Sequence, residues 1–188
     1  MIDFSLHIMD ILQNSIKAGA NVITTRIETD KEKDEFSISV QDDGCGMDEE
    51  FLKSVRDPFT TTRTTRRVGL GIPLFEDSFV NAEGGLDIVS GKNSGTTIRG
   101  SCRISHIDRI PLGDVAQTFM QLISSDPQIN FVLILENGIG SFHFSVEEVK
   151  EQLGDVPIDS MEVLEWIKDY INEGIKEIFG GVLNEITG

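Results

Sequence analysis

The chain has 188 residues, of which 32 are acidic and 16 basic, so its formal net charge is −16. This excess of negative charge argues against duplex nucleic acid and against an anionic membrane as partners. Two cysteines are too few for a disulfide framework or a four-cysteine zinc site. Because no apolar run approaches the ~20 residues of a membrane span, we expect a cytoplasmic protein.

The negative charge is distributed unevenly along the chain. Residues 1–106 hold 17 acids and 12 bases, a net charge of −5, whereas residues 107–188 hold 15 acids and 4 bases, a net charge of −11. Two regions with different surfaces are therefore expected. We predict one domain over residues 1–105 and a small, acidic α+β region over residues 106–188, which would dock a protein partner.

In the first region, the hydrophobic pattern predicts helices alternating with strands. Apolar residues at helical spacing predict a helix over residues 4–18. Strands follow over 22–28 and 36–41, then a short helix over 48–55, a mobile loop over 57–71 and a helix over 73–82. Two more strands, 86–89 and 96–104, complete an α+β fold, a two-layer α/β sandwich with helices on one face of a mixed sheet.

In the second region, the pattern predicts a helix over 113–124, a hairpin with strands over 131–136 and 141–145, and two terminal helices. Asn137 and Gly138 form a two-residue turn signal between the strands. Two capping boxes, Ser145 with Glu148 and Asp159 with Glu162, are expected to open the two helices.

Three polar side chains share one face of the first predicted helix. Asp10, Asn14 and Lys17 are spaced i, i+4 and i+7. An amide oxygen such as that of Asn14 suits Mg²⁺, and the ammonium of Lys17 suits a phosphate. The same spacing also describes an ordinary solvated helix face, which is the simpler interpretation of this helix taken alone.

One pair of spaced glycines follows a predicted strand, and a second pair precedes a predicted helix. Asp42 closes a strand and is followed by Gly44 and Gly46, so its carboxylate could accept a hydrogen bond from an adenine amine while the glycines let the backbone approach a flat ring. Gly69 and Gly71 precede a helix, whose N-terminal amides form an anion site. Each motif alone could equally be an ordinary turn.

Taken in order, these motifs resemble the GHKL superfamily, which has the Bergerat ATP-binding fold. The resemblance covers roughly residues 4–104 and implies ATP and Mg²⁺ as ligands. It implies that Asn14 binds the metal and that Asp42 reads the adenine. It further assigns to the nucleotide Lys17, Gly44, Gly46, Phe59, Thr62, Arg63, Gly69, Leu70, Gly71 and Thr96.

The sequence departs from the family pattern at its candidate catalytic residue. Many hydrolysing members carry glutamate four residues before the asparagine, and here that position is Asp10. An error of about 1 Å in the position of a base can cost ~100-fold in rate, so hydrolysis is expected to be slow or absent.

Three functions stay open at this stage. The first is a stand-alone regulatory protein kinase or ATP-dependent switch acting on a partner protein. The second is a non-catalytic module in which ATP orders residues 60–68 and exposes or hides a partner surface. The third is a permuted histidine autokinase that uses His106, because residues 105–112 resemble the family's H box.

Overall fold

The structure, a computed structural model, describes residues 2–55 and 70–184. Four predicted nucleotide contacts, Phe59, Thr62, Arg63 and Gly69, lie outside the described residues, as do the predicted mobile loop up to residue 69 and the segment 60–68.

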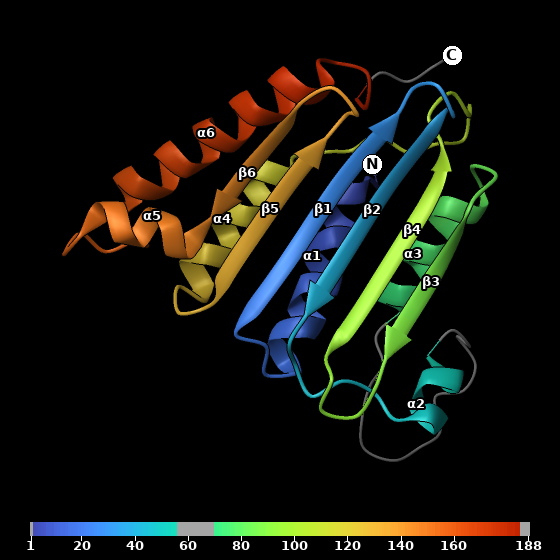
Figure 1. Cartoon of the computed structure of the whole chain (residues 1–188), viewed down its shortest axis with the longest axis horizontal. Helices are drawn as coiled ribbons and strands as arrows, with labels where there is room; N and C mark the ends of the chain where they lie inside the picture. The colour runs from blue at the N-terminus through green and yellow to red at the C-terminus, as the bar shows by residue number, and fades with distance from the viewer. Residues whose placement is uncertain (1, 56–69, 185–188) are drawn as a thin grey trace.

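One six-stranded sheet runs through the molecule in the order β3-β4-β2-β1-β5-β6 (Figure 1). The pair β1–β5 is parallel and the other four pairs are antiparallel, which confirms the predicted mixed sheet. The strands are β1 (Val22–Asp30), β2 (Glu35–Asp42), β3 (Gly85–Ser90), β4 (Thr96–Arg103), β5 (Asn130–Glu136) and β6 (Ser141–Ser145).

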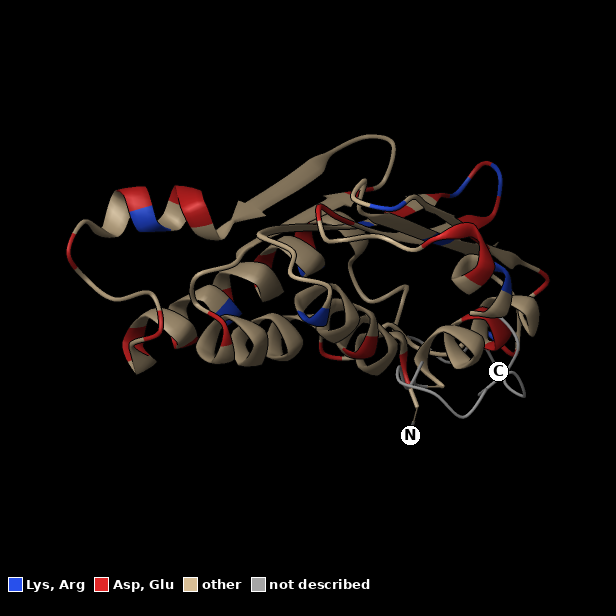
Figure 2. Ribbon diagram, turned by 90° about the horizontal axis from the view of Figure 1, so that it is seen from below, with Lys and Arg blue, Asp and Glu red and all other residues tan. Residues whose placement is uncertain are grey.

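Most of the helices form a second layer on one side of the sheet, whereas the helix over residues 146–153 continues from the last strand at the level of the sheet (Figures 1 and 2). Their bounds are α1 (Phe4–Lys17), α2 (Glu49–Ser54), α3 (Gly71–Val80), α4 (Val115–Ser125), α5 (Val146–Leu153) and α6 (Met161–Phe179). The two-layer α+β architecture predicted from the sequence is therefore confirmed. None of the described helices is both long and apolar enough to cross a membrane.

The layer arrangement follows from the period-two pattern of the strands. In β1, buried residues such as Ile23 and Ile27 alternate with partly exposed ones such as Arg26, as the sequence predicts. The inward side chains pack beneath the helices, and the outward face stays polar. There Arg26 forms an ion pair of 2.8 Å with Glu136 of β5.

Phenylalanine rings join the helices to the sheet at two places in the core. Phe4 of α1 lies 5.1 Å from Phe36 of β2 and 5.0 Å from Phe79 of α3, measured between ring centroids. Phe119 of α4 lies 6.4 Å from Phe131 of β5 in an edge-to-face arrangement. Both the sheet and the core continue across the predicted boundary at residues 105 and 106.

Two local details of the second region differ from the sequence-based prediction. The hairpin closes over residues 137–140, because Glu136 pairs with Ser141, so the predicted two-residue turn is wrong. The Asn137 carboxamide stabilises the longer loop by accepting hydrogen bonds from the amides of Ile139 and Gly140. Helix α6 has Ser160 as its N-cap, one residue after the predicted Asp159, whereas the predicted Ser145 cap of α5 is present.

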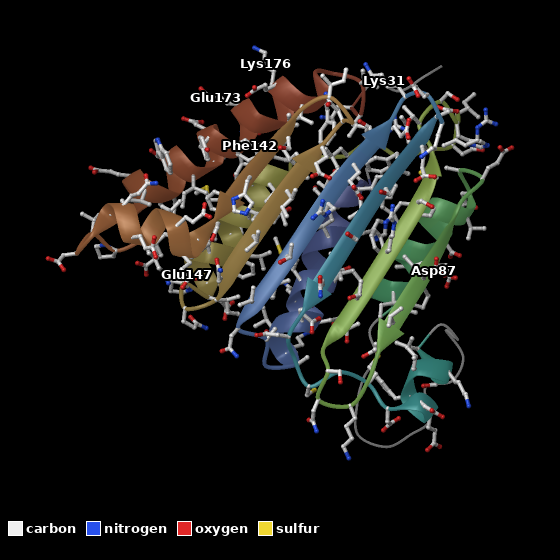
Figure 3. The ribbon with its side chains drawn as sticks, in the orientation of Figure 1. Lys31, Asp87, Phe142, Glu147, Glu173 and Lys176 are labelled. Carbon is white, nitrogen blue, oxygen red and sulfur yellow. The ribbon has the colours of Figure 1, made fainter. Side chains whose placement is uncertain are left out.

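Helix α6 packs along the edge strand β6. A Cβ atom added at Gly174 would lie 2.5 Å from the Phe142 ring, so only glycine lets the helix approach this closely. Phe142 lies on β6, the edge strand beside α6, and Asp87 lies on β3, the opposite edge strand of the sheet (Figure 3).

Candidate functional site

A cavity of about 350 Å³ lies at the end of the sheet where β2 stops and β4 starts. Its size falls within the range of small-molecule sites. Apolar side chains make up much of its wall, with polar groups concentrated on α1 and at the strand ends. The lining residues are Ile11, Asn14, Ser15, Lys17, Ala18, Asp42, Cys45, Gly46, Met47, Phe51, Val55, Ile72, Thr96 and Ile98.

The Asp42 carboxylate is held in a fixed orientation at the wall of this cavity. Its Oδ2 accepts a hydrogen bond of 2.6 Å from the hydroxyl of Ser15, and its Oδ1 accepts one of 2.9 Å from the amide of Gly44. An ionised carboxylate has about four lone-pair sites, so both oxygens keep acceptor capacity. The side chain is therefore ordered by the protein and still able to accept a donor from a ligand.

The neighbouring Asp43 has a different, structural role. Its Oδ1 accepts hydrogen bonds from the amides of Val22 at 3.0 Å and Asn21 at 2.7 Å, which join the end of β2 to the start of β1. These bonds lower the pKa of Asp43 below its usual value, the Val22 amide contributing most. Only the first of the two consecutive aspartates is thus directed at the cavity.

The loop after β2 packs closely on the turn between β3 and β4. Gly46 has a positive φ of 65°, and a Cβ atom there would lie 2.0 Å from the carbonyl oxygen of Gly91. The Ser90 hydroxyl accepts a hydrogen bond of 2.8 Å from the Met47 amide. A residue larger than glycine at position 46 would push the loop away from this turn and open the cavity wall.

The three polar residues predicted on one helix face do lie on α1, and two of them, Asp10 and Asn14, meet the start of α3. A Cβ atom at Gly71 would lie 3.3 Å from the Cβ of Asp10 and 4.0 Å from Nδ2 of Asn14. The first-turn amides of a helix have no intrahelical acceptor, and Pro73 supplies no amide at all. The glycine therefore lets the first turn of α3 approach Asp10 and Asn14 closely.

The other predicted contacts are arranged around these groups. Lys17 and Thr96 line the cavity, and Thr96 pairs with Asp42 across β4 and β2. Gly44 does not line it, but a Cβ there would lie 2.9 Å from the Cβ of Ala18, so this glycine fits the loop against α1. Leu70 is the N-cap of α3 and is exposed, and Asp10 is exposed beside the cavity.

Two of the histidines, His7 and His106, have structural contacts. His7 is buried between α1 and α3, with Nε2 2.9 Å from the Ser78 hydroxyl, and burial lowers its pKa. His106 lies in a turn after β4, where its Nδ1 accepts a hydrogen bond of 3.1 Å from the amide of Asp108. Strand β4 separates Thr96 from His106 by roughly 20 Å or more at ~3.4 Å per residue, so His106 lies far from the cavity of the same molecule.

Sequence reasoning missed most of the apolar wall and one polar residue. Ser15 is 3% exposed and lies on the apolar side of α1, in line with Ile8, Ile11 and Leu12. A buried hydroxyl in an apolar stripe was the signal that could have identified it. Met47, Phe51, Val55 and Ile98 carry no such signal, because their patterns match ordinary core residues.

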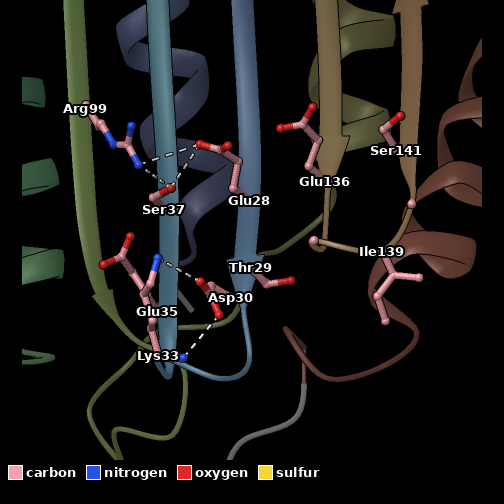
Figure 4. A pocket seen from close by; sticks show the side chains of 12 residues that line it. Glu28, Thr29, Asp30, Lys33, Glu35, Ser37, Arg99, Glu136, Ile139 and Ser141 are labelled. Carbon is pink, nitrogen blue, oxygen red and sulfur yellow. Dashed lines mark hydrogen bonds and ion pairs between the residues drawn. The ribbon is translucent and has the colours of Figure 1, made fainter.

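A second hollow lies on the opposite, helix-free face of the sheet (Figure 4). It has a volume of about 490 Å³ and is lined by charged side chains that pair with each other. Arg99 lies 3.7 Å from Glu28 and donates a hydrogen bond to Ser37. None of the residues predicted to bind a ligand lines it, whereas several of them line the cavity beside α1.

The fold and this cavity define a two-layer α+β protein with a cavity between one helix and the strand ends. Within this class, the chain belongs to the family of histidine kinase-, DNA gyrase B- and HSP90-like ATPases, which residues 3–105 match. The predicted membership of the GHKL superfamily is thereby confirmed. A solved N-terminal domain of a DNA repair protein shares the fold, with a TM-score of 0.50 and 16% identity over 97% of this chain and 58% of that chain.

Curated relatives include two bacterial protein kinases. The chain is 32% identical over 91 residues to the signal transduction histidine-protein kinase AtoS of Escherichia coli (strain K12), and 32% identical over 91 residues to sporulation kinase C of Bacillus subtilis (strain 168). Each match covers 48% of this chain, but only 15% and 21% of the respective kinases.

Proposed function

We propose that this protein binds Mg·ATP in the cavity beside α1 and acts as a regulatory protein kinase or an ATP-dependent switch on a partner protein. The observation that carries the proposal is the Asp42 carboxylate, fixed by Ser15 and Gly44 at a cavity with apolar walls. Membership of an ATPase family supports the identity of the nucleotide.

The adenine would bind between the apolar walls with its amine donating to Asp42. The apolar side chains of Met47 and Ile98 are available to pack against the adenine ring. The Asp42 carboxylate can accept a hydrogen bond from the adenine amine but would repel the carbonyl oxygen of guanine. Because Ser15 and Gly44 hold the carboxylate before binding, little conformational freedom is lost when the nucleotide enters.

The phosphates and the metal would lie toward Asn14 and the start of α3. Asn14 offers a neutral amide oxygen, which is a ligand of the type that Mg²⁺ accepts. Among the described residues there is no cluster of three or more metal-ligating side chains. The donor set therefore fits a metal that arrives with phosphate oxygens and water, and bound Mg²⁺ would neutralise charge on the phosphates. Lys17 supplies a further positive charge at the cavity.

Asp10 is the residue best suited to accept a proton from an attacking hydroxyl or water. It lies one helical turn before Asn14 and beside Gly71. Its side chain is one methylene shorter than glutamate, so it would align a water poorly. A partner protein that places its own hydroxyl closer to Asp10 would be less affected by the short reach of this side chain.

The second candidate function is a non-catalytic switch, in which nucleotide binding alone changes a partner surface. The exposed and short Asp10 favours this alternative, since a carboxylate that aligns water poorly leaves ATP bound rather than consumed.

Incubation with ATP labelled in the γ-phosphate separates the possibilities. The regulatory kinase predicts label on a partner protein, and the switch predicts bound but untransferred label. Acid-labile label on this chain itself would instead support an autokinase using His106, and lack of any nucleotide binding would refute the proposal as a whole.

A further inference from the structure

Helix α6 carries an exposed face on which aromatic and acidic side chains alternate. Residues spaced i, i+4, i+7, i+11 and i+15 lie on one side of a helix. On α6 this side is opposite the buried stripe that contains Leu164, Ile167 and Ile171. We call it the α6 outer face, and it consists of Glu162, Trp166, Asp169, Tyr170, Glu173 and Glu177.

Two aromatic rings form the centre of this face. Trp166 is 49% exposed and Tyr170 is 37% exposed. Their rings are stacked, with centroids 5.2 Å apart and planes at 7°, and Tyr170 also lies 5.0 Å from the Phe142 ring of β6. Since Gly174 allows α6 to press onto Phe142, the aromatic pair is held in place rather than mobile. Fixed, exposed aromatic rings are typical anchors of protein interfaces.

The acids around the rings lack partners. Within the part of the chain that the structure describes, none of the four acids of the α6 outer face forms an ion pair. Of the two lysines of α6, Lys168 does not neutralise the face, because it turns toward α4, where it donates to Gln117 at 2.7 Å. Glu173 and Lys176 point outward from α6 (Figure 3).

We propose that the α6 outer face docks a basic, arginine-bearing segment of a partner protein. Arginine fits both components of the face, because its planar guanidinium stacks on tryptophan and pairs with carboxylates. A second copy of this chain fits poorly, since a symmetric contact would set the acids of one face against those of the other. Nucleic acid is repelled by the same charges. This docking surface rests on the proposed function, because it is the surface at which the partner protein of that function would bind.

Trp166 is the single tryptophan of the chain, so tryptophan fluorescence reports on this surface alone. The probe is a fluorescein-labelled amphipathic peptide with leucine on one face and arginine on the other. Matched peptides carry lysine or glutamate in place of arginine. We expect saturable binding of the arginine peptide with a change in Trp166 emission, weaker binding of the lysine peptide and none of the glutamate peptide. Binding should weaken severalfold between low and moderate salt.

Variants locate the binding on α6. The double change Asp169→Asn with Glu173→Gln should weaken the arginine peptide at least threefold, and Trp166→Ala about fivefold. The matched control is Asp77→Asn with Asp87→Asn, which removes two exposed charges from α3 and from β3, the edge strand opposite β6, and should leave the affinity unchanged. Circular dichroism checks that each variant is folded.

Equal peptide affinity in the wild type and the α6 variants would overturn the proposal, as would an equal loss in the control. Sedimentation that reveals a dimer lost in the α6 variants would assign the face to a second copy instead, and DNA binding lost in the same variants would assign it to nucleic acid. The titrations are done without nucleotide. Calorimetry of Mg·ATP on the same variants therefore shows separately whether the proposed ATP site fails.

Discussion

The hydroxyl of Ser15 donates a 2.6 Å hydrogen bond to the carboxylate of Asp42, joining helix α1 to the end of strand β2 in the wall of the candidate ATP cavity. Both residues line that cavity, and Ser15 is otherwise enclosed by protein. The bond makes the orientation of Asp42 depend on α1, the helix that also carries Asn14. The adenine and metal ends of the proposed site are thus held by one rigid element.

Removal of this hydroxyl should weaken nucleotide binding through Asp42. Ser15→Ala leaves Oδ2 without its donor, and a lost hydrogen bond of this kind corresponds to about 1 kcal/mol, or roughly fivefold in ATP affinity. The loss should shrink in a chain that already carries Asp42→Asn, since both changes act on one contact. Additive losses in calorimetry of the four proteins would contradict this coupling.

Turnover should be limited by the short side chain at position 10. Asp10→Glu extends the carboxylate by one methylene toward the site and should raise ATP hydrolysis. Asp10→Asn should abolish any remaining activity and leave ATP binding largely intact, because Asn14 and Asp42 are unchanged. A steady-state ATPase assay measures both effects. Identical rates in all three proteins would mean that Asp10 is only a solvated helix residue.

The fold was largely predictable from the sequence because it follows from strong periodic patterns. The alternation in β1 and the apolar stripe of α1 each specify an element and its buried side. The parallel pairing of β5 with β1 could not be predicted, since it joins residues about a hundred positions apart and no local pattern encodes it. The predicted two-residue turn after β5 was wrong because the Asn137 side chain forms hydrogen bonds within its own loop, and these bonds favour a loop of four residues.

The candidate site was predictable only in part, for a related reason. Asp42, Asn14 and Gly71 stand in recognisable motifs, and the structure brings them around one cavity end. The division of roles between Asp42 and Asp43 depends on which backbone amides each carboxylate meets, and that is settled by tertiary contacts alone. The apolar wall is likewise indistinguishable in sequence from the hydrophobic core.

The two cysteines offer a direct test of where the nucleotide binds. Cys45 is exposed and lines the cavity, whereas Cys102 is buried, and burial raises the pKa of its thiol to about 12. Because the thiolate is the reactive form, Cys102 should remain unmodified in the folded protein at pH 8. Mg·ATP at ten times its dissociation constant should slow alkylation of Cys45 about tenfold.

Mass spectrometry after a short reaction with iodoacetamide distinguishes the two cysteines. Cys45→Ser should take up no label until urea exposes Cys102. If Mg·ATP leaves the alkylation of Cys45 unchanged at concentrations that saturate binding, the nucleotide binds elsewhere.

Acid should destabilise the contact between α1 and α3 through His7. Burial lowers the pKa of His7 from its usual 6.5, so the folded protein disfavours the protonated ring. At pH 7.5 both folded and unfolded chains hold a neutral ring. As the pH falls below 6.5, the unfolded chain binds the proton first, and the free energy of unfolding decreases by at most ~1.4 kcal/mol per pH unit.

Urea unfolding of the wild type and of His7→Gln at pH 7.5, 6.5 and 5.5 measures this effect. The stability advantage of the wild type should narrow as the pH falls, because glutamine does not titrate. A difference that stays constant over this range would show that His7 has the same pKa in the folded and unfolded states.

Calorimetric titration with Mg·ATP tests most directly whether the cavity beside α1 binds adenine through Asp42. Asp42→Asn replaces an acceptor oxygen with a donor facing the adenine amine, which should cost ~1–3 kcal/mol, or roughly ten- to a hundredfold in affinity. The matched control is Asp48→Asn, which removes the same charge nearby but keeps the N-cap of α2, since asparagine caps as well as aspartate. The account predicts wild-type affinity for the control, a large loss for Asp42→Asn and weaker binding of GTP than of ATP. Equal ATP affinity in the wild type and Asp42→Asn would contradict it.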